Sequence, residues 1–223
     1  MAIFALSDLH LPLGNDKPMD VFGAGWDNYV GKIEYNWKKI VKDTDCVIIN
    51  GDFSWAMYME ESLADFKFID SLPGKKILTK GNHDYWWATI TKLNKFKEKH
   101  NLESVFFIHN SAIKIGDVAI SGTRGWICPS DKNFKKDDMK IYERELSRFE
   151  TSVKEACGLA DTVIAALHYP PDDAFVKIMA DYNVSLCVFG HLHGRKAEEF
   201  KSPYKNCLLV SSDYLRFIPK RLF

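Results

Sequence analysis

Short apolar runs of strand length recur along the chain, and segments with helical spacing lie between several of them. The runs predict β-strands at Ala2–Leu6, Cys46–Ile49, Lys76–Thr79, Val105–Ile108, Ala112–Ile115, Val118–Ser121, Thr162–Leu167, Leu186–Phe189 and Cys207–Val210. Apolar residues three or four positions apart predict α-helices at Tyr29–Lys42, Glu60–Ser71, Trp87–Lys99, Asp137–Cys157 and Asp173–Tyr182. The pattern indicates an α/β protein.

The order of these elements predicts how the sheets are built. The first three strands alternate with helices, which indicates right-handed βαβ units and a largely parallel region. The runs Ala112–Ile115 and Val118–Ser121 flank Gly116-Asp117, a pair that favours an antiparallel hairpin. We therefore expect mixed sheets with helices outside them. The chain shows no internal repeat, low-complexity stretch or linker, so we expect one domain over residues 1–223.

One segment lacks a clear period. Leu11–Tyr29 is rich in proline and glycine, and a loop of this length in a compact domain is usually functional or mobile. Because it begins directly after His10, a residue of the candidate site described below, we expect it to lie over that site.

Composition narrows the classes of partner. Lys and Arg together number 30, as do Asp and Glu, so the formal net charge is zero. A neutral chain gives no support to a nucleic-acid-binding or membrane-binding surface. No apolar run approaches the roughly 18 residues of a membrane span. The run Ala2–Leu6 is too short for a signal peptide and is followed by Asp8.

The cysteines indicate the compartment. They are odd in number, five, and none forms a C-x-x-C pair. Cys46, Cys187 and Cys207 lie in apolar runs, where cysteine behaves as a small buried hydrophobe. This usage fits a reducing compartment better than a disulfide scaffold, so we expect a cytoplasmic protein.

Polar residues of metal-ligand type follow five of the apolar runs. They form the blocks Asp-x-His, Gly-Asp, Gly-Asn-His-Asp, His and Gly-His-x-His, with ligand-type residues Asp8, His10, Asp52, Asn82, His168, His191 and His193. Because the carboxyl ends of strands meet at one edge of an α/β sheet, these side chains should converge there. In an extended chain, residues two positions apart point to the same side. Asp8 and His10 should therefore point to one side together, and so should His191 and His193. A two-metal hydrolytic site is the leading hypothesis.

The donor types restrict the metal. Carboxylate, imidazole and amide oxygen together are a poor set for structural zinc, which favours Cys and His. They suit two divalent ions in open catalytic coordination, with Mn²⁺ favoured and Fe or Zn²⁺ as alternatives. Two such ions supply about four positive charges, and Asp8 with Asp52 return two. The centre would stay cationic and attract a phosphate.

Taken together, the blocks from Asp8 to His193 resemble the calcineurin-like metallophosphoesterase superfamily. The resemblance implies a four-layer αββα sandwich, an α/β fold with two mixed β-sheets packed face to face between helices. It also implies that Asp8, His10 and His193 hold one metal, that Asn82, His168 and His191 hold another, and that Asp52 bridges the two. His83 would sit near the scissile phosphate and protonate or stabilise the leaving group, and Asp84 would orient His83.

One block departs from a branch of that superfamily. Its protein serine/threonine phosphatases extend the second block to G-D-x-x-D-R-G, whereas this chain has Gly51-Asp52-Phe53-Ser54-Trp55-Ala56. The missing acid and arginine argue against protein phosphatase activity. Phosphomonoesters, phosphodiesters, nucleotides, cyclic nucleotides and DNA ends stay open as substrates.

We expect a phosphohydrolase in which the metals generate a hydroxide that attacks phosphorus, acting on a small phosphorylated substrate such as a nucleotide. A phosphodiesterase or nuclease of the same superfamily is one alternative, though zero net charge weakens the nuclease version. A non-catalytic protein-binding scaffold on this fold is another, and the complete set of ligand positions disfavours it.

Residues outside the blocks allow two interpretations each. Arg124, just after a predicted strand, could bind substrate phosphate through its guanidinium fork or form an ion pair at the surface. Tryptophans follow several blocks and could stack on a nucleobase, or pack in the core, the commoner place for a large aromatic. They are Trp55, Trp86, Trp87 and Trp126.

Overall fold

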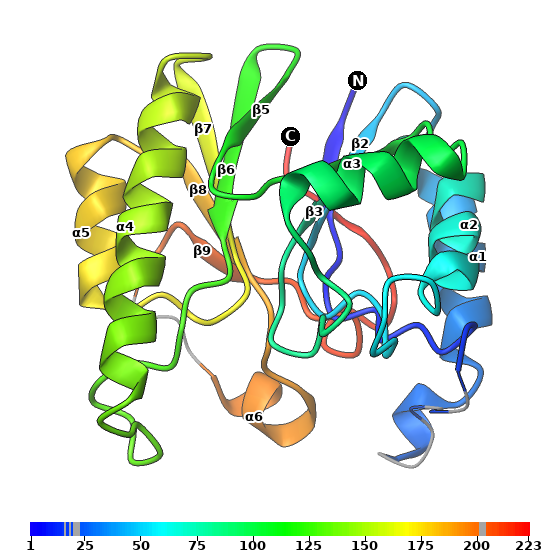
Figure 1. The fold of residues 1–223 in the computed structure, drawn as a ribbon, viewed down its shortest axis with the longest axis horizontal. Helices are drawn as coiled ribbons and strands as arrows, with labels where there is room; N and C mark the ends of the chain where they lie inside the picture. Colours follow the sequence, from blue (N-terminus) through cyan, green and yellow to red (C-terminus); the bar gives the residue numbers. More distant parts are fainter. Residues whose placement is uncertain (16, 18, 20–22, 201–203) are drawn as a thin grey trace.

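Two five-stranded sheets pack face to face at the centre of the computed structural model, which describes residues 1–15, 17, 19, 23–200 and 204–223 (Figure 1). The first sheet has the order β10 (Lys220–Arg221), β1 (Ile3–Ala5), β2 (Cys46–Asn50), β3 (Lys75–Thr79) and β4 (Val105–Phe107). The second has the order β5 (Ala112–Ile115), β6 (Val118–Thr123), β7 (Thr162–Leu167), β8 (Leu186–Phe189) and β9 (Cys207–Leu209).

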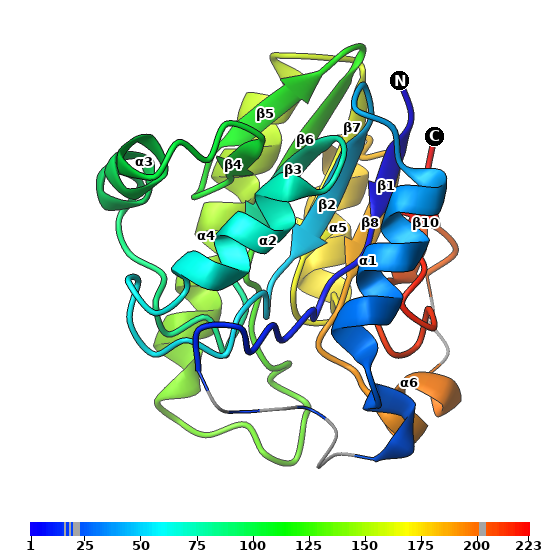
Figure 2. The ribbon, with the colours of Figure 1, turned by 90° about the vertical axis from the view of Figure 1, so that its right-hand side faces the viewer.

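Helices cover the outer face of each sheet. The first sheet carries α1 (Tyr29–Ile40), α2 (Leu63–Ser71) and α3 (Ile90–Lys99), and the second carries α4 (Asp138–Cys157) and α5 (Asp173–Asp181) (Figures 1 and 2). The four-layer αββα sandwich with two mixed sheets is therefore confirmed. None of the helices in the described part of the chain has the length and apolar character needed to cross a bilayer.

Pairing is parallel within each sheet and antiparallel at one edge. Strand β10 runs antiparallel to β1, which brings the two termini together, and β5 runs antiparallel to β6. Ile115 pairs with Val118 across the turn at Gly116, which has a φ of 60° that glycine tolerates. The predicted hairpin and the predicted parallel region are both confirmed.

The alternation of side chains along the central strands divides the core into layers. In β2, Cys46 and Ile48 face the second sheet, while Val47 and Ile49 face the helices. In β7, Ile164 packs between the two sheets, and Ala165 packs beneath α4 and α5. Both faces of these strands are buried, so they read as continuous apolar runs.

The two sheets are joined by hydrogen bonds at the carboxyl ends of their strands. Directly after β1, the Ser7 N–H donates to the Val210 carbonyl, and the Ser212 N–H donates to the Ser7 carbonyl, both at 2.9 Å. The Asn50 side-chain amide donates to the carbonyl of Leu167 at 2.7 Å. These contacts bring the ends of β1 and β2 against the ends of β9 and β7.

The structure also differs from the predicted elements. It contains a short helix α6 (Gly194–Glu199), a one-turn 3₁₀ helix η2 (Ala24–Trp26) and strand β10, which are too short to show a period in sequence. Helix α3 begins at Ile90 rather than Trp87, because the Trp86 indole donates to Asp84 and the Trp87 indole donates to His109. Both indoles are buried, as the core interpretation predicted.

Lys76 is a polar residue inside a predicted apolar strand. Its side chain is fully buried, and its ammonium donates to the carbonyls of Leu72 and Gly74, to that of Asp70 at 3.3 Å and to the hydroxyl of Ser104 at 2.9 Å. The carbonyls belong to the end of α2 and the turn behind it, which the helix itself leaves without partners. Lys76 thus holds α2 to the sheet.

Replacing Lys76 by Met should lower the free energy of unfolding by about 2 kcal/mol or more, because buried carbonyls lose a charged donor. The effect should depend on pH. Burial lowers the pKa of Lys76 from 10.5 to about 8. Between these values the unfolded chain holds more protons than the folded chain, so wild-type stability relative to Lys76→Met should rise as pH rises from 8 to 10.

Urea unfolding at a series of pH values measures both effects. Lys75→Met on the same strand is the matched control, since Lys75 is exposed, and it should change stability little. Equal stability losses in the two variants would show that the buried hydrogen bonds contribute nothing specific.

Candidate metal centre

The carboxyl ends of five strands bring the seven predicted ligand residues to one edge of the sandwich. Asp8 and His10 follow β1, Asp52 follows β2 and Asn82 follows β3, all in the first sheet. From the second sheet, His168 follows β7, and the pair His191 and His193 follows β8. Their side chains form two groups, each with ligand atoms close enough to share one cation.

The first group consists of Asp8, His10 and His193, whose ligand atoms all lie within 4.8 Å of one another. The Nε2 atoms of the two imidazoles face each other at 3.4 Å, and His193 Nε2 lies 3.5 Å from Asp8 Oδ1. Two facing ring nitrogens beside a carboxylate are a suitable donor set for one divalent ion.

The second group consists of Asn82, His168 and His191. The Asn82 Oδ1 atom lies 2.7 Å from His168 Nε2 and 2.8 Å from His191 Nδ1. An amide oxygen between two imidazole nitrogens again offers three donor atoms around one position.

Asp52 lies between the two groups. Its Oδ2 atom is 3.4 Å from His168 Nε2 in the second group and 3.8 Å from His10 Nε2 in the first. Its other oxygen, Oδ1, accepts the backbone N–H of His83 at 2.8 Å, which fixes the carboxylate in this position. One carboxylate thus reaches a histidine of each group.

The backbone at these positions is held in an unusual conformation. Asp8, His10, Asp52 and His191 have φ angles of 56°, 45°, 50° and 71°, in the left-handed region that non-glycine residues rarely adopt. Such conformations cluster at functional sites and persist only where the surrounding structure enforces them. Here each follows the end of a strand and turns the chain sharply, so that the ligand side chain points into the site.

Glycines in the blocks allow the loops to approach the carboxylates. A Cβ atom on Gly81 would overlap the side chain and backbone nitrogen of Asp52, and one on Gly190 would overlap the carboxylate of Asp8. The residue after Gly190 is His191, whose backbone N–H donates to Asp8 Oδ1 at 3.0 Å. The glycines are therefore explained by the close packing of the ligand loops.

Burial and charge set the protonation of the centre. Burial opposes ionisation of Asp8, but the hydrogen bond from His193 and the charge of His168 outweigh it and lower the pKa to about 2. Burial lowers the pKa of His10 to about 4 and, with the charge of His168, that of His191 to about 3. These two imidazoles are neutral and carry free lone pairs at neutral pH, as metal ligands require.

The other two imidazoles compensate the carboxylates. Burial disfavours the charged form of His168, yet the charge of Asp52 outweighs it and raises the pKa to about 9. Likewise, hydrogen bonds to Asp213 and Asp8 outweigh burial and raise the pKa of His193 to about 10. A bound metal would take the place of these two protons. The residues therefore fit divalent cations in charge as well as in donor type.

Two hydrogen bonds orient the imidazoles for ligation. The Nδ1 atom of His168 lies 3.1 Å from the carbonyl of Asn50, and that of His193 lies 2.9 Å from Asp213 Oδ1. A partner on Nδ1 leaves Nε2 as the ligand atom and increases its basicity. Sequence reasoning missed Asp213, although it follows the strand Cys207–Val210 as the other ligand residues follow theirs.

A cavity of about 440 Å³ opens onto the two groups. Met19 and Trp26 from the proline- and glycine-rich segment line it, together with Trp55 and His83. The ring of Trp55 stacks on His10 with centroids 4.5 Å apart. Met19 and Trp26 therefore lie over the site as expected for residues 11–29, whereas the Leu13 N–H donates to Asp65 on α2. Residues 16, 18 and 20–22 lie outside the described residues.

Asp84 holds the backbone of the ligand loops. Its buried carboxylate accepts the N–H groups of Asp52 and Phe53, each at 2.9 Å, that of Gly81 at 2.7 Å and the indole of Trp86 at 3.1 Å. No contact found among the described residues joins it to the imidazole of His83. Asp84 therefore fixes the backbone of two ligand loops, and the implied role in orienting His83 stays a prediction.

Comparison with known proteins agrees with this geometry. A sequence model of calcineurin-like phosphoesterases matches residues 1–195, which hold all seven candidate ligand residues. The chain belongs to the calcineurin-like phosphoesterase family. Membership places it among the metal-dependent phosphoester hydrolases in general. None of the curated proteins compared with it matches.

Solved structures share the fold of this calcineurin-like phosphoesterase at low identity. A protein of unknown function, AQ665 from Aquifex aeolicus, is 17% identical with a TM-score of 0.54, covering 99% of this chain and 95% of that one. Phosphopantetheinyl hydrolase (PptH) from Mycobacterium tuberculosis is 12% identical with a TM-score of 0.57, covering 100% and 95%. GAP50, the anchor in the inner membrane complex of Plasmodium, is 11% identical with a TM-score of 0.50, covering 96% and 72%.

Arg124 is not among the residues that line the cavity over the candidate metal ligands. Its guanidinium stacks on Trp126 with its central carbon 4.2 Å from the ring centroid, and it lies 3.7 Å from the carboxylate of Glu145. Its backbone carbonyl accepts the N–H groups of His168 and Tyr169. The side chain lines a separate cavity, considered below.

We expect Asp213→Asn to weaken metal binding about 10- to 100-fold, the usual cost of losing the partner of a ligating histidine. Asparagine keeps the size of the side chain but cannot accept hydrogen bonds from both His193 and the Gly194 N–H. Titration of the chelated protein with Mn²⁺ would measure the loss. Asp181→Asn, which changes an exposed acid on α5, is the control; an unchanged affinity in Asp213→Asn would make Asp213 a loop anchor only.

Proposed function

We propose that this chain is a dinuclear-metal phosphohydrolase that cleaves a small phosphoester. The observation that carries the proposal is the position of Asp52, one carboxylate oxygen of which lies within 4 Å of a histidine in each ligand group. A single structural ion needs no such carboxylate between two donor sets. Asp8, His10 and His193 would hold one ion, Asn82, His168 and His191 the other, and Asp52 both.

The metals supply one part of the chemistry. When bound, they polarise the phosphoryl oxygens and lower the pKa of water so that it attacks near neutral pH. The mixed oxygen and nitrogen donors favour Mn²⁺, with Fe or Zn²⁺ as alternatives. The four imidazoles and the Asn82 amide would be neutral ligands once metals replace the protons. Asp8 and Asp52 would then offset only two of the roughly four positive charges of two divalent ions, so the centre would attract an anionic ester.

The chain supplies proton transfer and exclusion of water. His83 lines the cavity, with its ring 5.8 Å from that of His10 and 4.9 Å from that of Trp55. From there its imidazole would protonate the leaving oxygen. The apolar walls formed by Met19, Trp26 and Trp55 would contact the leaving group and keep bulk water away.

The size of the cavity supports a small phosphorylated substrate. A volume of about 440 Å³ lies within the range of pockets for small molecules. The lining favours a leaving group with an apolar part, and a nucleotide is one such substrate.

A phosphodiesterase activity remains the alternative within the family, while membrane and nucleic-acid partners stay disfavoured by the charge of the chain. A cytoplasmic location stays a prediction.

The anchor GAP50 has the same fold, so the fold alone does not separate an enzyme from a scaffold. The site residues support the enzyme. A scaffold has no need for seven ligand side chains converging beneath an open cavity, nor for two buried aspartates compensated by histidines.

We expect protein reconstituted with Mn²⁺ to bind two ions per chain and to hydrolyse an aryl phosphate. Asp52→Asn should lower occupancy and reduce kcat by about 100-fold or more, because both ligand groups lose a donor. Elemental analysis and assays with monoester and diester substrates would measure this. Asp117→Asn, in the exposed turn between β5 and β6, is the control. One ion per chain at full activity would contradict the dinuclear proposal, and bound metal without hydrolysis would favour the scaffold.

His83→Ala should keep both metals and lower kcat by about 10²- to 10⁴-fold, the range for a positioned acid or base. The loss should be large for alkyl phosphates and small for activated aryl phosphates, whose leaving groups need no proton. Metal analysis and kinetics on an alkyl and an aryl ester test this split. His100→Ala, at the end of α3, is the control. Loss of metal in His83→Ala would assign His83 to the structure of the centre.

A further inference from the structure

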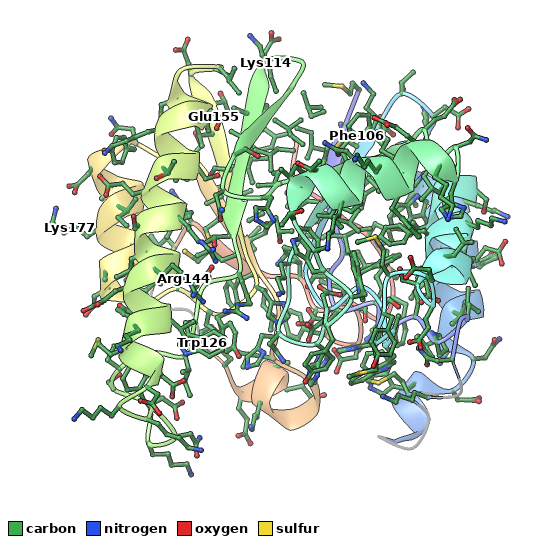
Figure 3. All side chains as sticks on the ribbon, viewed as in Figure 1. Phe106, Lys114, Trp126, Arg144, Glu155 and Lys177 are labelled. Atoms are coloured by element: carbon green, nitrogen blue, oxygen red, sulfur yellow. The ribbon has the colours of Figure 1, made fainter. Side chains whose placement is uncertain are left out.

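A second cavity of about 450 Å³ lies beside the metal centre, between the ends of β3 and β6 and the inner face of α4. We call it the basic pocket. Its lining includes five charged residues, Lys80, Arg124, Arg144, Glu145 and Arg148, together with the imidazole of His109. Figure 3 shows Arg144 on α4 and Trp126 near the lower end of the same helix.

Two backbone connections join the basic pocket to the metal centre. Lys80 directly precedes the Gly81-Asn82 block. On the other side, the carbonyl of Arg124 accepts the N–H of His168 at 3.1 Å. The pocket and the ligand loops therefore share two segments of chain.

The charges of the basic pocket do not balance. Lys80, Arg124, Arg144 and Arg148 are four cations, and Glu145 is the single acid among the lining residues, which leaves a surplus of three positive charges. Lys80 has no acidic partner within 4.0 Å among the described residues.

Glu145 is already saturated. It is 2% exposed, its Oε1 atom lies 2.8 Å from Arg148, 3.7 Å from Arg124 and 4.0 Å from Arg144, and its Oε2 atom accepts from the hydroxyl of Thr123. One or two of these arginines would suffice to pair with a single carboxylate.

A purely structural role for this cluster leaves part of it unexplained. If the cluster only fastened α4 to β6, the surplus cations would repel one another with no compensating gain. In addition, the buried Nε–H of Arg124 has no hydrogen-bond partner in the described structure, and such groups are rare in native proteins. A bound anion would relieve both features.

Donors in the pocket suit a phosphoryl group. A guanidinium matches phosphate oxygens in a bidentate arrangement, and three of them line this cavity. The Trp87 indole donates to His109 Nδ1 at 2.9 Å, so the N–H of the neutral imidazole is on Nε2 and is a further donor.

We propose that the basic pocket binds a phosphate-type oxyanion, as a site separate from the metal centre. Two sources share this chemistry: a second phosphoryl group on the substrate, and a free polyphosphate acting as an effector. Binding to this site does not depend on catalysis, so it can be measured on protein without metals, and a failure here would leave the proposed hydrolase untouched.

The test is calorimetric titration of the chelated, dialysed full chain with inorganic tripolyphosphate. We expect saturable binding at one site, weakened about tenfold or more in Arg144→Gln and in Arg148→Gln. Both residues are partly exposed, with side chains 53% and 37% accessible, so the variants should fold. Lys154→Gln, on the same helix but outside the pocket, removes the same charge and should change affinity less than about twofold. Absence of saturable binding, or equal weakening by Lys154→Gln, would overturn the proposal.

Kinetics with metals restored would separate the two sources. If the pocket holds part of the substrate, Arg148→Gln should raise KM for a bisphosphorylated ester and leave KM for a monophosphate ester unchanged. If it holds an effector, KM for both esters should stay unchanged in the variant, although its tripolyphosphate binding is weakened.

Discussion

The junction between the carboxyl ends of the two sheets is the constraint on which the site depends. Hydrogen bonds from Ser7 and Ser212 join the end of β1 to the end of β9, and the Asn50 amide joins β2 to β7. Each ligand group takes residues from both sheets, so neither group exists in one sheet alone. Any shift of one sheet against the other would separate His193 from Asp8 and His168 from Asn82.

This junction confines charge in a dry environment, and the chain balances that charge. Asp8 and Asp52 are ionised despite complete burial because His168 and His193 are protonated beside them. Isolated buried carboxylates would instead take up protons. The same arrangement makes the centre ready for divalent cations, which can replace the two protons without moving a side chain far.

The surroundings of the centre divide into an apolar side and a cationic side. Met19, Trp26 and Trp55 form the walls over the ligands, while Lys80 and the arginines of α4 and the β6 end form the basic pocket. Zero net charge over the whole chain conceals this local separation. Composition excludes a broad basic face, but it carries no information about a pocket that several distant segments build together.

The sequence by itself determined the order of the longer strands and helices, the hairpin at Gly116 and the motif blocks that follow the strands. The reason is that hydrophobic period and turn chemistry are properties of neighbouring residues. It also pointed to the seven ligand residues, since the carboxyl ends of parallel strands meet at one edge. Only the tertiary structure decided that Asp84 holds the backbone of the ligand loops, that Asp213 supports His193, and that Lys76 caps α2 from within a strand. The tertiary structure alone shows that positive charges outnumber negative ones in the basic pocket. Those roles arise from contacts between segments far apart in the chain, and no local pattern encodes which buried donor meets which acceptor.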